Sequence, residues 1–500
     1  MATAYPVSSN ASPQPERDET PIPLCVDLDG TLVKSDLLFE QLVRLIRKSP
    51  LSVFTLLFIV LRRGIANGKR WLAEHVQVDI STLPYHAPLL AYLEHEAQKR
   101  PIWLCTGSDQ VIARQIADHI GLFTGVLASD GTTNRTGKRK SDLLCQRFGD
   151  GGFDYVGNEA QDFEVWPQAR HALVVSRSAP FLERVRARFD VVKTFPLPPL
   201  RLADLVKSIR AHQWTKNALI LLPILLAHGA PNPTLISQCL LAFFSFSLMA
   251  SATYILNDLV DLESDRQNHN KRHRPYASGQ IAIALGLILI PLLGLSSIAL
   301  ASQLPLSFAL LLLAYTVTTL LYTFKFKGVP MLDVTLLSLL YTLRVVVGMV
   351  LVGEAWSFWL LAFSLFFFFS LALAKRVTEI TNKLKRQPEV QSIRGYHPRD
   401  LSLLINLGGC SGLLSVLVIA MYVNGEKVQE LYQYPQLLWL ICPIMLFWVA
   451  RFWLITIRGG LHEDPILFAV RDKMSLVMMC ICISIVLSAA YGGSLYAVLF

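Results

Sequence analysis

Paired cysteines and secretion signals are missing from this 500-residue sequence. Its eight cysteines form no CxxC pair and show no spacing typical of secreted proteins, so we exclude a disulfide scaffold and expect reduced thiols facing a cytoplasm. Residues 1–21 are polar and open no cleavable signal peptide, so we expect a disordered lead. The net charge of +9 comes without a basic patch interleaved with aromatic residues, so we expect no nucleic-acid partner.

Charged residues are scarce and apolar residues are unevenly distributed. Only 17% of the residues are charged and 53% are hydrophobic, which is too apolar for an ordinary soluble protein. Residues 1–200 have a globular composition, whereas apolar stretches of roughly 20 residues, long enough to cross about 30 Å of hydrocarbon, follow from residue 210 onward. We therefore expect several domains: the lead at 1–21, an α/β domain at 22–200, and an all-α membrane bundle of about nine transmembrane helices at 205–500. The expected spans are 217–235, 237–257, 281–301, 305–324, 332–352, 356–374, 401–422, 435–456 and 475–497.

The loops between these spans indicate the orientation. Lys and Arg concentrate in the loops after the second, fourth, sixth and eighth spans, whereas the alternate loops contribute essentially Lys427 alone. By the positive-inside rule the lysine- and arginine-rich loops are cytoplasmic, and the N-terminal domain with them. We expect a multi-pass protein of the cell (inner or plasma) membrane with the bilayer as a partner, and the oligomeric state stays open.

The α/β domain begins with an apolar strand that runs into Asp27, Asp29 and a turn glycine in the sequence DLDGT. Such an arrangement presents one nucleophilic carboxylate and one acid/base carboxylate to a phosphate. The motif resembles motif I of the haloacid dehalogenase (HAD) superfamily, whose fold is a Rossmannoid α/β domain. The resemblance implies a phosphate-binding Thr106 or Ser108 at the end of a second strand, and a lysine for which Lys140 is the first choice and Lys138 the second.

The fourth HAD motif departs from the usual pattern of two acids. The segment DYVGNEAQD supplies Asn158, Glu159 and Asp162, so one formal charge is missing from the Mg²⁺ site that the resemblance implies for Asp27 and Asp162. Either Glu159 compensates, or metal affinity and turnover are reduced. An active phosphatase and a degenerate HAD fold kept as a scaffold both remain open.

An apolar segment separates the first two HAD motifs. Residues 51–61 (LSVFTLLFIVL) are bounded by Lys48 on one side and by Arg62 and Arg63 on the other. Eleven residues are too few to span a bilayer. A cap helix and an interfacial hairpin resting on the membrane remain the alternatives.

Residues 257–265 (NDLVDLESD) carry three acids and an amide at intervals of three and four, at the mouth of an apolar helix-length segment. On a helix, residues three and four positions apart share a face, and unneutralised like charges there repel by roughly 0.2 to 0.5 kcal/mol per pair. A divalent cation would offset this repulsion, and hard oxygen ligands suit Mg²⁺, which bridges carboxylates to phosphate oxygens. The residues of this face are Asn257, Asp258, Asp261 and Asp265.

With the basic KRHRPYASG stretch that follows, this motif resembles the first aspartate-rich motif of the UbiA superfamily of intramembrane prenyltransferases. The resemblance covers about residues 205–495 and implies Mg²⁺ ligation by Asp258, Asp261 and Asp265. It implies substrate binding by Asn257, with Arg272 and Arg274 neutralising phosphate oxygens. The segment YTFKFKGVPMLD resembles the family's second motif, in which Tyr322 and either Lys325 or Lys327 would hold phosphate and Asp333 would hold metal.

Two further basic residues are candidates for substrate binding. Arg344 lies about 16 Å beyond Asp333 along a helix, and an arginine within a span is costly, so we expect an anionic partner, either a motif acid or a substrate phosphate. Lys216 at the start of the first expected span, together with Lys375 and Arg376, would complete a basic ring on the cytoplasmic face.

The segments AKRVTE, RGY and RGGLHEDPILFAVRD are most similar to the UbiA branch that includes decaprenyl-phosphate phosphoribosyltransferase. The resemblance implies transfer from phosphoribosyl pyrophosphate, a diphosphate-bearing donor, to a polyprenyl phosphate, the lipid acceptor. From the pairing of the two domains alone, we hypothesise that the HAD domain removes the 5-phosphate from the product. One alternative is aromatic prenyl transfer from a polyprenyl diphosphate. The other is a HAD phosphatase that its helices merely tether to the membrane.

Overall fold

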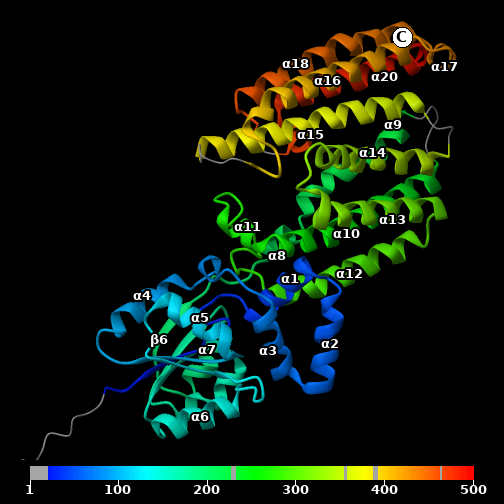
Figure 1. The fold of residues 1–500 in the computed structure, drawn as a ribbon. Helices are drawn as coiled ribbons and strands as arrows, with labels where there is room; N and C mark the ends of the chain where they lie inside the picture. Colours follow the sequence, from blue (N-terminus) through cyan, green and yellow to red (C-terminus); the bar gives the residue numbers. More distant parts are fainter. Residues whose placement is uncertain (1–20, 227–231, 354–356, 387–391, 462–463, 500) are drawn as a thin grey trace, which may run out of the picture. The chain divides into compact units, whose positions relative to one another are not determined.

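The chain forms two compact units in a computed structural model that describes residues 21–226, 232–353, 357–386, 392–461 and 464–499 (Figure 1). Unit 1 comprises the chain up to Arg201 together with the segment Leu262–Ile283, and unit 2 comprises Leu202–Asp261 and Ala284–Phe500. The predicted lead at 1–21 lies, apart from Pro21, outside the described residues.

Unit 1 is built on a six-stranded sheet in the order β3-β2-β1-β4-β5-β6, and every strand pair is parallel. Parallel strands are covered by helices on both faces, so they are apolar throughout. The central strand β1 has the sequence LCV and is fully buried, in accord with this rule. The strands are β1 (Leu24–Val26), β2 (Ile102–Asp109), β3 (Gly125–Ser129), β4 (Asp154–Gly157), β5 (Ala172–Ser176) and β6 (Val191–Pro196).

Helices connect these strands and add an insertion between β1 and β2. The insertion holds α1 (Leu37–Lys48), α2 (Ser52–Arg63), α3 (Ile65–His75), the 3₁₀ turn η1 (Ile80–Thr82) and α4 (Ala87–Glu96). The remaining connections are α5 (Gln110–Ile120), α6 (Lys138–Phe148), η2 (Ala160–Glu164), η3 (Trp166–Gln168) and α7 (Ala179–Arg186). This part of the chain therefore has the α/β architecture expected from its sequence.

The segment Leu262–Ile283, which begins within the aspartate-rich motif, is a structural part of unit 1 and contains α11 (Leu262–Gln267). Arg266 forms a two-pronged ion pair with Glu40 of α1, with N–O distances of 2.5 and 3.1 Å, and donates from Nε to the Ala277 carbonyl at 2.9 Å. Arg177 donates to the Gly279 carbonyl at 2.6 Å. From the sequence we expected this segment to belong to the membrane domain at 205–500.

Unit 2 is helical, and eight of its described helical segments are long and apolar enough to cross a membrane. These are Pro233–Val260, Ile283–Ala301, Leu306–Phe326, Leu332–Val352, Phe358–Arg386, Pro398–Val423, Pro435–Ile457 and Lys473–Tyr491. The expectation of nine is corrected at the first span, 217–235. There the described chain forms a 3₁₀ helix followed by a helix of five residues, and α10 begins only at Pro233.

The helices of unit 2 follow one another in chain order. They are α8 (Leu202–Ser208), η4 (Ala211–Leu221), α9 (Leu222–Leu226), α10 (Pro233–Val260), α12 (Ile283–Ala301), α13 (Leu306–Leu321), the π-helical turn η5 (Tyr322–Phe326), α14 (Leu332–Val352), α15 (Phe358–Arg386), η6 (Pro398–Asp400), α16 (Leu401–Val423), α17 (Glu426–Leu431), η7 (Pro435–Leu440), α18 (Ile441–Ile457), α19 (Pro465–Arg471) and α20 (Lys473–Leu499).

Small residues allow close packing between some of these helices. Gly408 of α16 faces the Trp453 ring of α18 so closely that an added Cβ would lie 2.1 Å from it, and the Trp453 indole donates to Ser370 Oγ of α15 at 3.0 Å. Small residues and interhelical hydrogen bonds are the usual means of association between helices in lipid.

Candidate functional sites

The first site lies at the carboxyl ends of β1, β2 and β4 in unit 1. Asp27 follows β1, Thr106 and Ser108 lie at the end of β2, and Asn158 follows β4. The strand order places β2 on one side of β1 and β4 on the other, which makes the β1–β4 boundary the topological switch point of the sheet. Ligands bind outside the carboxyl ends of the strands at such a point.

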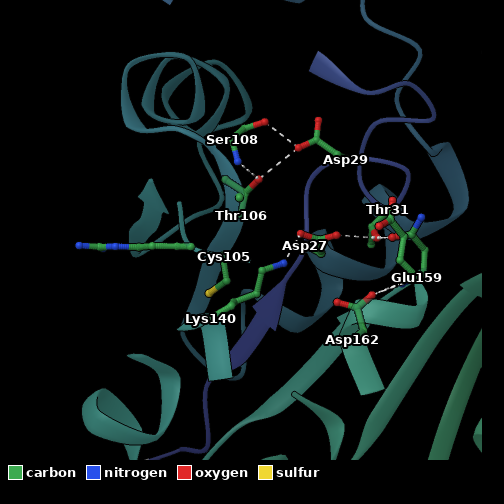
Figure 2. Close-up of polar contacts among 12 residues, drawn as sticks. Asp27, Asp29, Thr31, Cys105, Thr106, Ser108, Lys140, Glu159 and Asp162 are labelled. Atoms are coloured by element: carbon green, nitrogen blue, oxygen red, sulfur yellow. Dashed lines mark hydrogen bonds and ion pairs between the residues drawn. The ribbon is translucent and has the colours of Figure 1, made fainter. Parts of the chain in front are cut away.

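A chain of buried polar groups runs across this site (Figure 2). Lys140 Nζ donates to Asp27 Oδ1 at 2.7 Å and to the Tyr155 hydroxyl at 3.0 Å. The Tyr155 hydroxyl in turn donates to Asp162 Oδ1 at 2.8 Å, and Asp162 Oδ2 accepts two backbone N–H groups, those of Asn158 and Glu159, at 2.8 Å. Of the two lysine candidates, Lys140 lies buried at the site, whereas Lys138 is exposed.

A second hydrogen-bonded group holds Asp29. Its Oδ2 accepts from Ser108 Oγ at 2.6 Å and from Thr106 Oγ1 at 3.3 Å, and its Oδ1 accepts from the Leu37 amide at 2.8 Å. Figure 2 shows Asp29 beside Thr106 and Ser108, and Asp27 beside Lys140. Both hydroxyl candidates therefore reach the same carboxylate.

Asn158 and Thr31 complete the mouth of this site. Thr31 Oγ1 donates to Asn158 Oδ1 at 2.9 Å and lies 3.4 Å from Asp27 Oδ2. The carboxylate oxygen of Asp27 and the amide oxygen of Asn158 are therefore both within hydrogen-bond distance of the Thr31 hydroxyl. Mg²⁺ is usually held by one or two carboxylates, water and substrate phosphate. Asp27 and Asn158 supply oxygen donors that fit this ion, whereas the acceptors of Asp162 are already occupied by Tyr155 and two amides.

Burial dominates the electrostatics of the first site. It raises the pKa of Asp27 to about 7, against the opposing effect of Lys140, and it also raises the pKa of Glu159. Burial alone would lower the pKa of Lys140, but the carboxylates Asp27 and Asp162 outweigh it and raise that pKa. Lys140 is thus a permanent positive charge beside the carboxylate of Asp27.

The second site lies in unit 2, where each motif acid meets a basic side chain from another segment. Asp258, near the end of α10, accepts from Arg210 Nε at 2.8 Å, and Asp261, which caps α10, pairs with Lys327 just after η5. Lys325 is exposed, and among the described residues it pairs with no acid. Of the two lysines between which the sequence left the choice open, Lys327 is therefore the one that meets a motif acid.

The second-motif acid Asp333, at the start of α14, is fully buried. Arg376 pairs with it, and the Tyr396 hydroxyl donates to Asp333 Oδ1 at 2.5 Å. Arg394 donates to the Tyr322 hydroxyl at 3.2 Å and pairs with Glu379 at 3.1 Å. The segments AKRVTE and RGY therefore meet the second motif directly.

Lys216 lies at a third ion pair of unit 2. Its Nζ lies 2.7 Å from Asp464 Oδ2, and Lys375 lies 3.1 Å from the same oxygen. Burial lowers the pKa of Lys216 to about 8, although Asp464 acts in the opposite direction.

Arg344 departs from its predicted environment. It donates to Asn217 Oδ1 at 2.8 Å and to the Leu340 carbonyl, and it lies against the rings of three aromatic residues, Phe246, Tyr315 and Tyr341. No carboxylate pairs with Arg344 in the part of the chain that the structure describes. Of the two anionic partners expected for Arg344, a motif acid does not lie beside it, because aromatic faces and an amide oxygen occupy its surroundings, and a substrate phosphate stays a prediction.

The remaining residues predicted from the first motif divide between the two units. Asp265 pairs with Arg274 at 2.5 Å, and both belong to unit 1, as does the exposed Arg272. Asn257 lies on α10 in unit 2, partly buried.

Sequence reasoning missed the roles of Arg210 and Asp464. Arg210 precedes the first apolar segment, and its left-handed backbone (φ 52°) is not visible in the sequence. Asp464 lies within RGGLHEDPILFAVRD, but the acids of that segment follow no three- or four-residue spacing that would have indicated a site.

The donor chemistry at Asp258 and Asp261 fits Mg²⁺. The two carboxylates lie three positions apart at one helix end, where their side chains are neighbours. Among the described residues no third acid, histidine or cysteine joins them in a metal-sized cluster. Two carboxylates leave the coordination positions that this ion fills with water and substrate phosphate.

Comparisons with known proteins match unit 2 most clearly. Residues 218–387 match the UbiA prenyltransferase family. The uncharacterized protein y4nM of Sinorhizobium fredii is 36% identical over 91% of this chain and 88% of that protein. The decaprenyl-phosphate phosphoribosyltransferase of Corynebacterium glutamicum is 33% identical over 44% of this chain and 68% of that protein. The structure of a UbiA homolog from Archaeoglobus fulgidus bound to DMAPP and Mg²⁺ is 16% identical, with a TM-score of 0.45, and covers 57% of this chain and 99% of that chain. The chain belongs to the UbiA prenyltransferase family and is a multi-pass membrane transferase of that family.

Proposed function

We propose that unit 2 transfers a phosphoribosyl group from phosphoribosyl pyrophosphate to a polyprenyl phosphate in the membrane. A relative named decaprenyl-phosphate phosphoribosyltransferase supports the choice of donor and acceptor. The observation that carries the proposal is the pairing of two acids of the first motif with basic residues, Asp258 with Arg210 and Asp261 with Lys327.

Such pairs suit an exchange of partners. The acids would turn to Mg²⁺, which would draw electrons from the leaving diphosphate, and the released cations would turn to phosphate oxygens. Arg210 offers a bidentate fork and Lys327 a compact charge for this purpose. Lys216 and Lys375, which share Asp464, provide two more cations for the negatively charged diphosphate that leaves.

A donor screen in membranes tests this proposal. Labelled phosphoribosyl pyrophosphate and a labelled prenyl diphosphate are each incubated with the full chain, and label in the lipid phase is counted. We expect label from the first donor only, and its loss in Asp258→Ala and Asp261→Ala. Label from the prenyl diphosphate alone would favour aromatic prenyl transfer, and full transfer by both alanine variants would contradict a transferase site at this motif.

We further propose that unit 1 is a phosphatase of the HAD type, Mg²⁺-dependent like the transferase. Asp27 would attack phosphorus, Asp29 would protonate the leaving oxygen, and Lys140 would hold the charge on the phosphate. The buried pair of Lys140 and Asp27 supports this reading, and the hydroxyls beside Asp29 supply phosphate donors at the same strand end. Asn158 in place of an acid lowers the charge of the metal site without removing its oxygen.

Phosphate release tests the second activity. The lipid-linked ribose 5-phosphate formed by the full chain is assayed for loss of inorganic phosphate, in the wild type and in Asp27→Asn. The full chain is required because unit 1 includes Leu262–Ile283. We expect release by the wild type and none by Asp27→Asn, with transfer to lipid unchanged. Equal release by both proteins, or none by either, would reduce unit 1 to a scaffold.

A further inference from the structure

Helix α2 in unit 1 presents a face of large apolar side chains to the outside of the unit. Five large apolar residues, the N-cap Leu51 and four residues of the helix itself, are more than half exposed: Leu51 75%, Phe54 71%, Leu57 53%, Phe58 59% and Leu61 77%. At 100° per residue these positions fall within an arc of roughly 120°. Single exposed apolar residues are ordinary, but a contiguous stripe of this size marks an interaction surface.

The opposite face of α2 is already satisfied. Leu56 is buried there, and Val53 and Val60 pack with it against Leu72 of α3 in a small apolar cluster. Gly68 of α3 allows this contact, because an added Cβ would lie 2.5 Å from Val60. The helical hairpin formed by α2 and α3 therefore has a small apolar core of its own, which fixes the orientation of the exposed apolar stripe.

The charge around α2 is of one sign. Between Glu40 and Glu74 the sequence contains no acid and seven basic residues, Arg44, Arg47, Lys48, Arg62, Arg63, Lys69 and Arg70. Four of them flank the two ends of α2 and are exposed, and none of the four pairs with a carboxylate of the described chain: Arg47, Lys48, Arg62 and Arg63. An apolar stripe flanked by Lys and Arg is the pattern of a helix that lies in the headgroup region of an anionic bilayer.

The second leg of the hairpin reaches the phosphatase site. Lys69 of α3 donates from Nζ to the Gly107 carbonyl at 2.8 Å, and Gly107 lies between Thr106 and Ser108. Lys69 also donates to Asn134 Oδ1 at 3.2 Å, and Arg70 pairs with Asp109 at 3.3 Å. The strand end that carries the phosphate-binding hydroxyls is thus fastened to the hairpin that carries the apolar stripe.

We propose that the apolar face of α2 inserts into the headgroup region of the cytoplasmic leaflet, so that the phosphatase site acts on a phosphate monoester carried by a membrane lipid. The second half of this statement rests on the phosphatase function proposed above. The choice of a bilayer over a second copy of the chain follows from the four unpaired basic residues at both ends of the stripe, which would repel their own copies. The sequence left a cap helix and an interfacial hairpin as alternatives. In this proposal the hairpin of α2 and α3 is both, because α2 contacts the membrane and Lys69 of α3 contacts the phosphatase site.

The chemical step is a hydrolysis in two halves. A carboxylate oxygen of Asp27 bonds to phosphorus as the bond from phosphorus to the lipid-linked alcohol oxygen breaks, and Asp29 gives that oxygen a proton. Water then attacks the aspartyl phosphate, gives a proton to Asp29 and releases inorganic phosphate. The net reaction consumes one water and yields the lipid-linked alcohol.

Photocrosslinking tests the membrane contact without reference to activity. A diazirine amino acid replaces Phe58 in the full chain, reconstituted in vesicles that contain phosphatidylglycerol, and the crosslinked species are identified by mass spectrometry. The control position is Val192, an apolar residue of β6 that is 53% exposed in the same unit. We expect lipid adducts at position 58 at least tenfold above those at 192. Adducts to a second chain at position 58, or equal lipid labelling at both positions, would overturn the insertion of α2.

A substrate comparison tests the consequence for the phosphatase. Phosphate release from soluble ribose 5-phosphate and from lipid-linked ribose 5-phosphate is measured for the wild type, for Phe54→Glu/Phe58→Glu and for the control Val192→Glu. We expect the double variant to lose at least tenfold on the lipid-linked substrate and less than twofold on the soluble one, with the control unchanged on both. Equal losses on both substrates would overturn the lipid preference. If neither the wild type nor any variant releases phosphate, the phosphatase proposal is refuted, and the membrane contact of α2 is then decided by the crosslinking experiment alone.

Discussion

The ion pair between Glu40 and Arg266 gives a prediction about how the segment Leu262–Ile283 is held to the rest of unit 1. The pair ties this segment to α1, and its side chains are only 4% and 6% exposed. Ser35 Oγ also donates to Glu40 Oε1 at 2.6 Å. Glu40→Gln keeps the size of the side chain and removes its charge, which leaves the Arg266 guanidinium buried without a counterion.

Removing one partner of a buried pair costs about 3 to 5 kcal/mol. Because Arg177 also holds this segment through the Gly279 carbonyl, we take the lower end of that range, about 3 kcal/mol. At about 1.4 kcal/mol per factor of ten, local opening of the segment should become roughly 100-fold more frequent.

Limited trypsin digestion of the full chain measures this opening, since the segment contains Lys271 and Arg272 as cleavage sites. When opening and closing are fast relative to cleavage, the cleavage rate follows the population of the open form. The matched control is Glu74→Gln, which breaks the exposed pair with Arg70 and should change cleavage by less than about fivefold, the equivalent of about 1 kcal/mol. An unchanged rate in Glu40→Gln would refute the structural role of the pair. Because Leu262 directly follows Asp261, we also expect slower transfer to lipid in this variant.

Three further predictions concern the two sites. Lys327→Ala should lower transfer by at least tenfold, whereas Lys325→Ala on the same turn should change it less than twofold, as counted by label in the lipid phase; equal effects would contradict the assignment to Lys327. Asp464→Asn should lower the pKa of Lys216 from about 8, because the carboxylate that opposes the effect of burial is gone. Lys216 then loses its proton at lower pH, so the donor KM, measured from pH 6.5 to 9, should begin to rise at a lower pH than in the wild type. Superimposable pH profiles of the two proteins would count against Lys216 as a phosphate ligand. Tyr155→Phe should lower phosphate release by roughly fivefold, about 1 kcal/mol for a lost hydrogen bond, with transfer unaffected; a parallel loss of transfer would indicate misfolding rather than a local effect.

Much of unit 1 could be predicted because its signals are local. Strand-length apolar runs end in Asp27, Thr106 and Asn158, and parallel strands bring their carboxyl ends to one edge of the sheet. The sequence therefore indicated which residues would meet. It could not show that the oxygens of Asp162 would accept hydrogen bonds from Tyr155 and two backbone amides, since those contacts depend on the turn after β4.

Unit 2 was predictable in its helices but less so in its contacts. Hydropathy identified eight of the spans, whereas the first expected span is broken into η4 and α9, and apolar length alone does not reveal such a break. The protein groups around Arg344 were not foreseen either, since charge balance indicated an anionic partner, whereas the structure supplies three aromatic faces and Asn217. Pairings between distant segments, such as Lys216 with Asp464, leave no trace in one sequence.

The membership of Leu262–Ile283 in unit 1 also constrains how often the chain crosses the bilayer. A compact water-soluble domain occupies one side of a membrane, so a chain that leaves it at Arg201 and rejoins it at Leu262 crosses an even number of times. Helix α10 accounts for one crossing. The other falls to the segment that carries η4 and α9, whose irregular backbone is permitted at membrane depth only where protein surrounds it. Lys216, Asn217 and Ile220 of η4 are indeed buried, so parity turns an apparently missing span into a broken one.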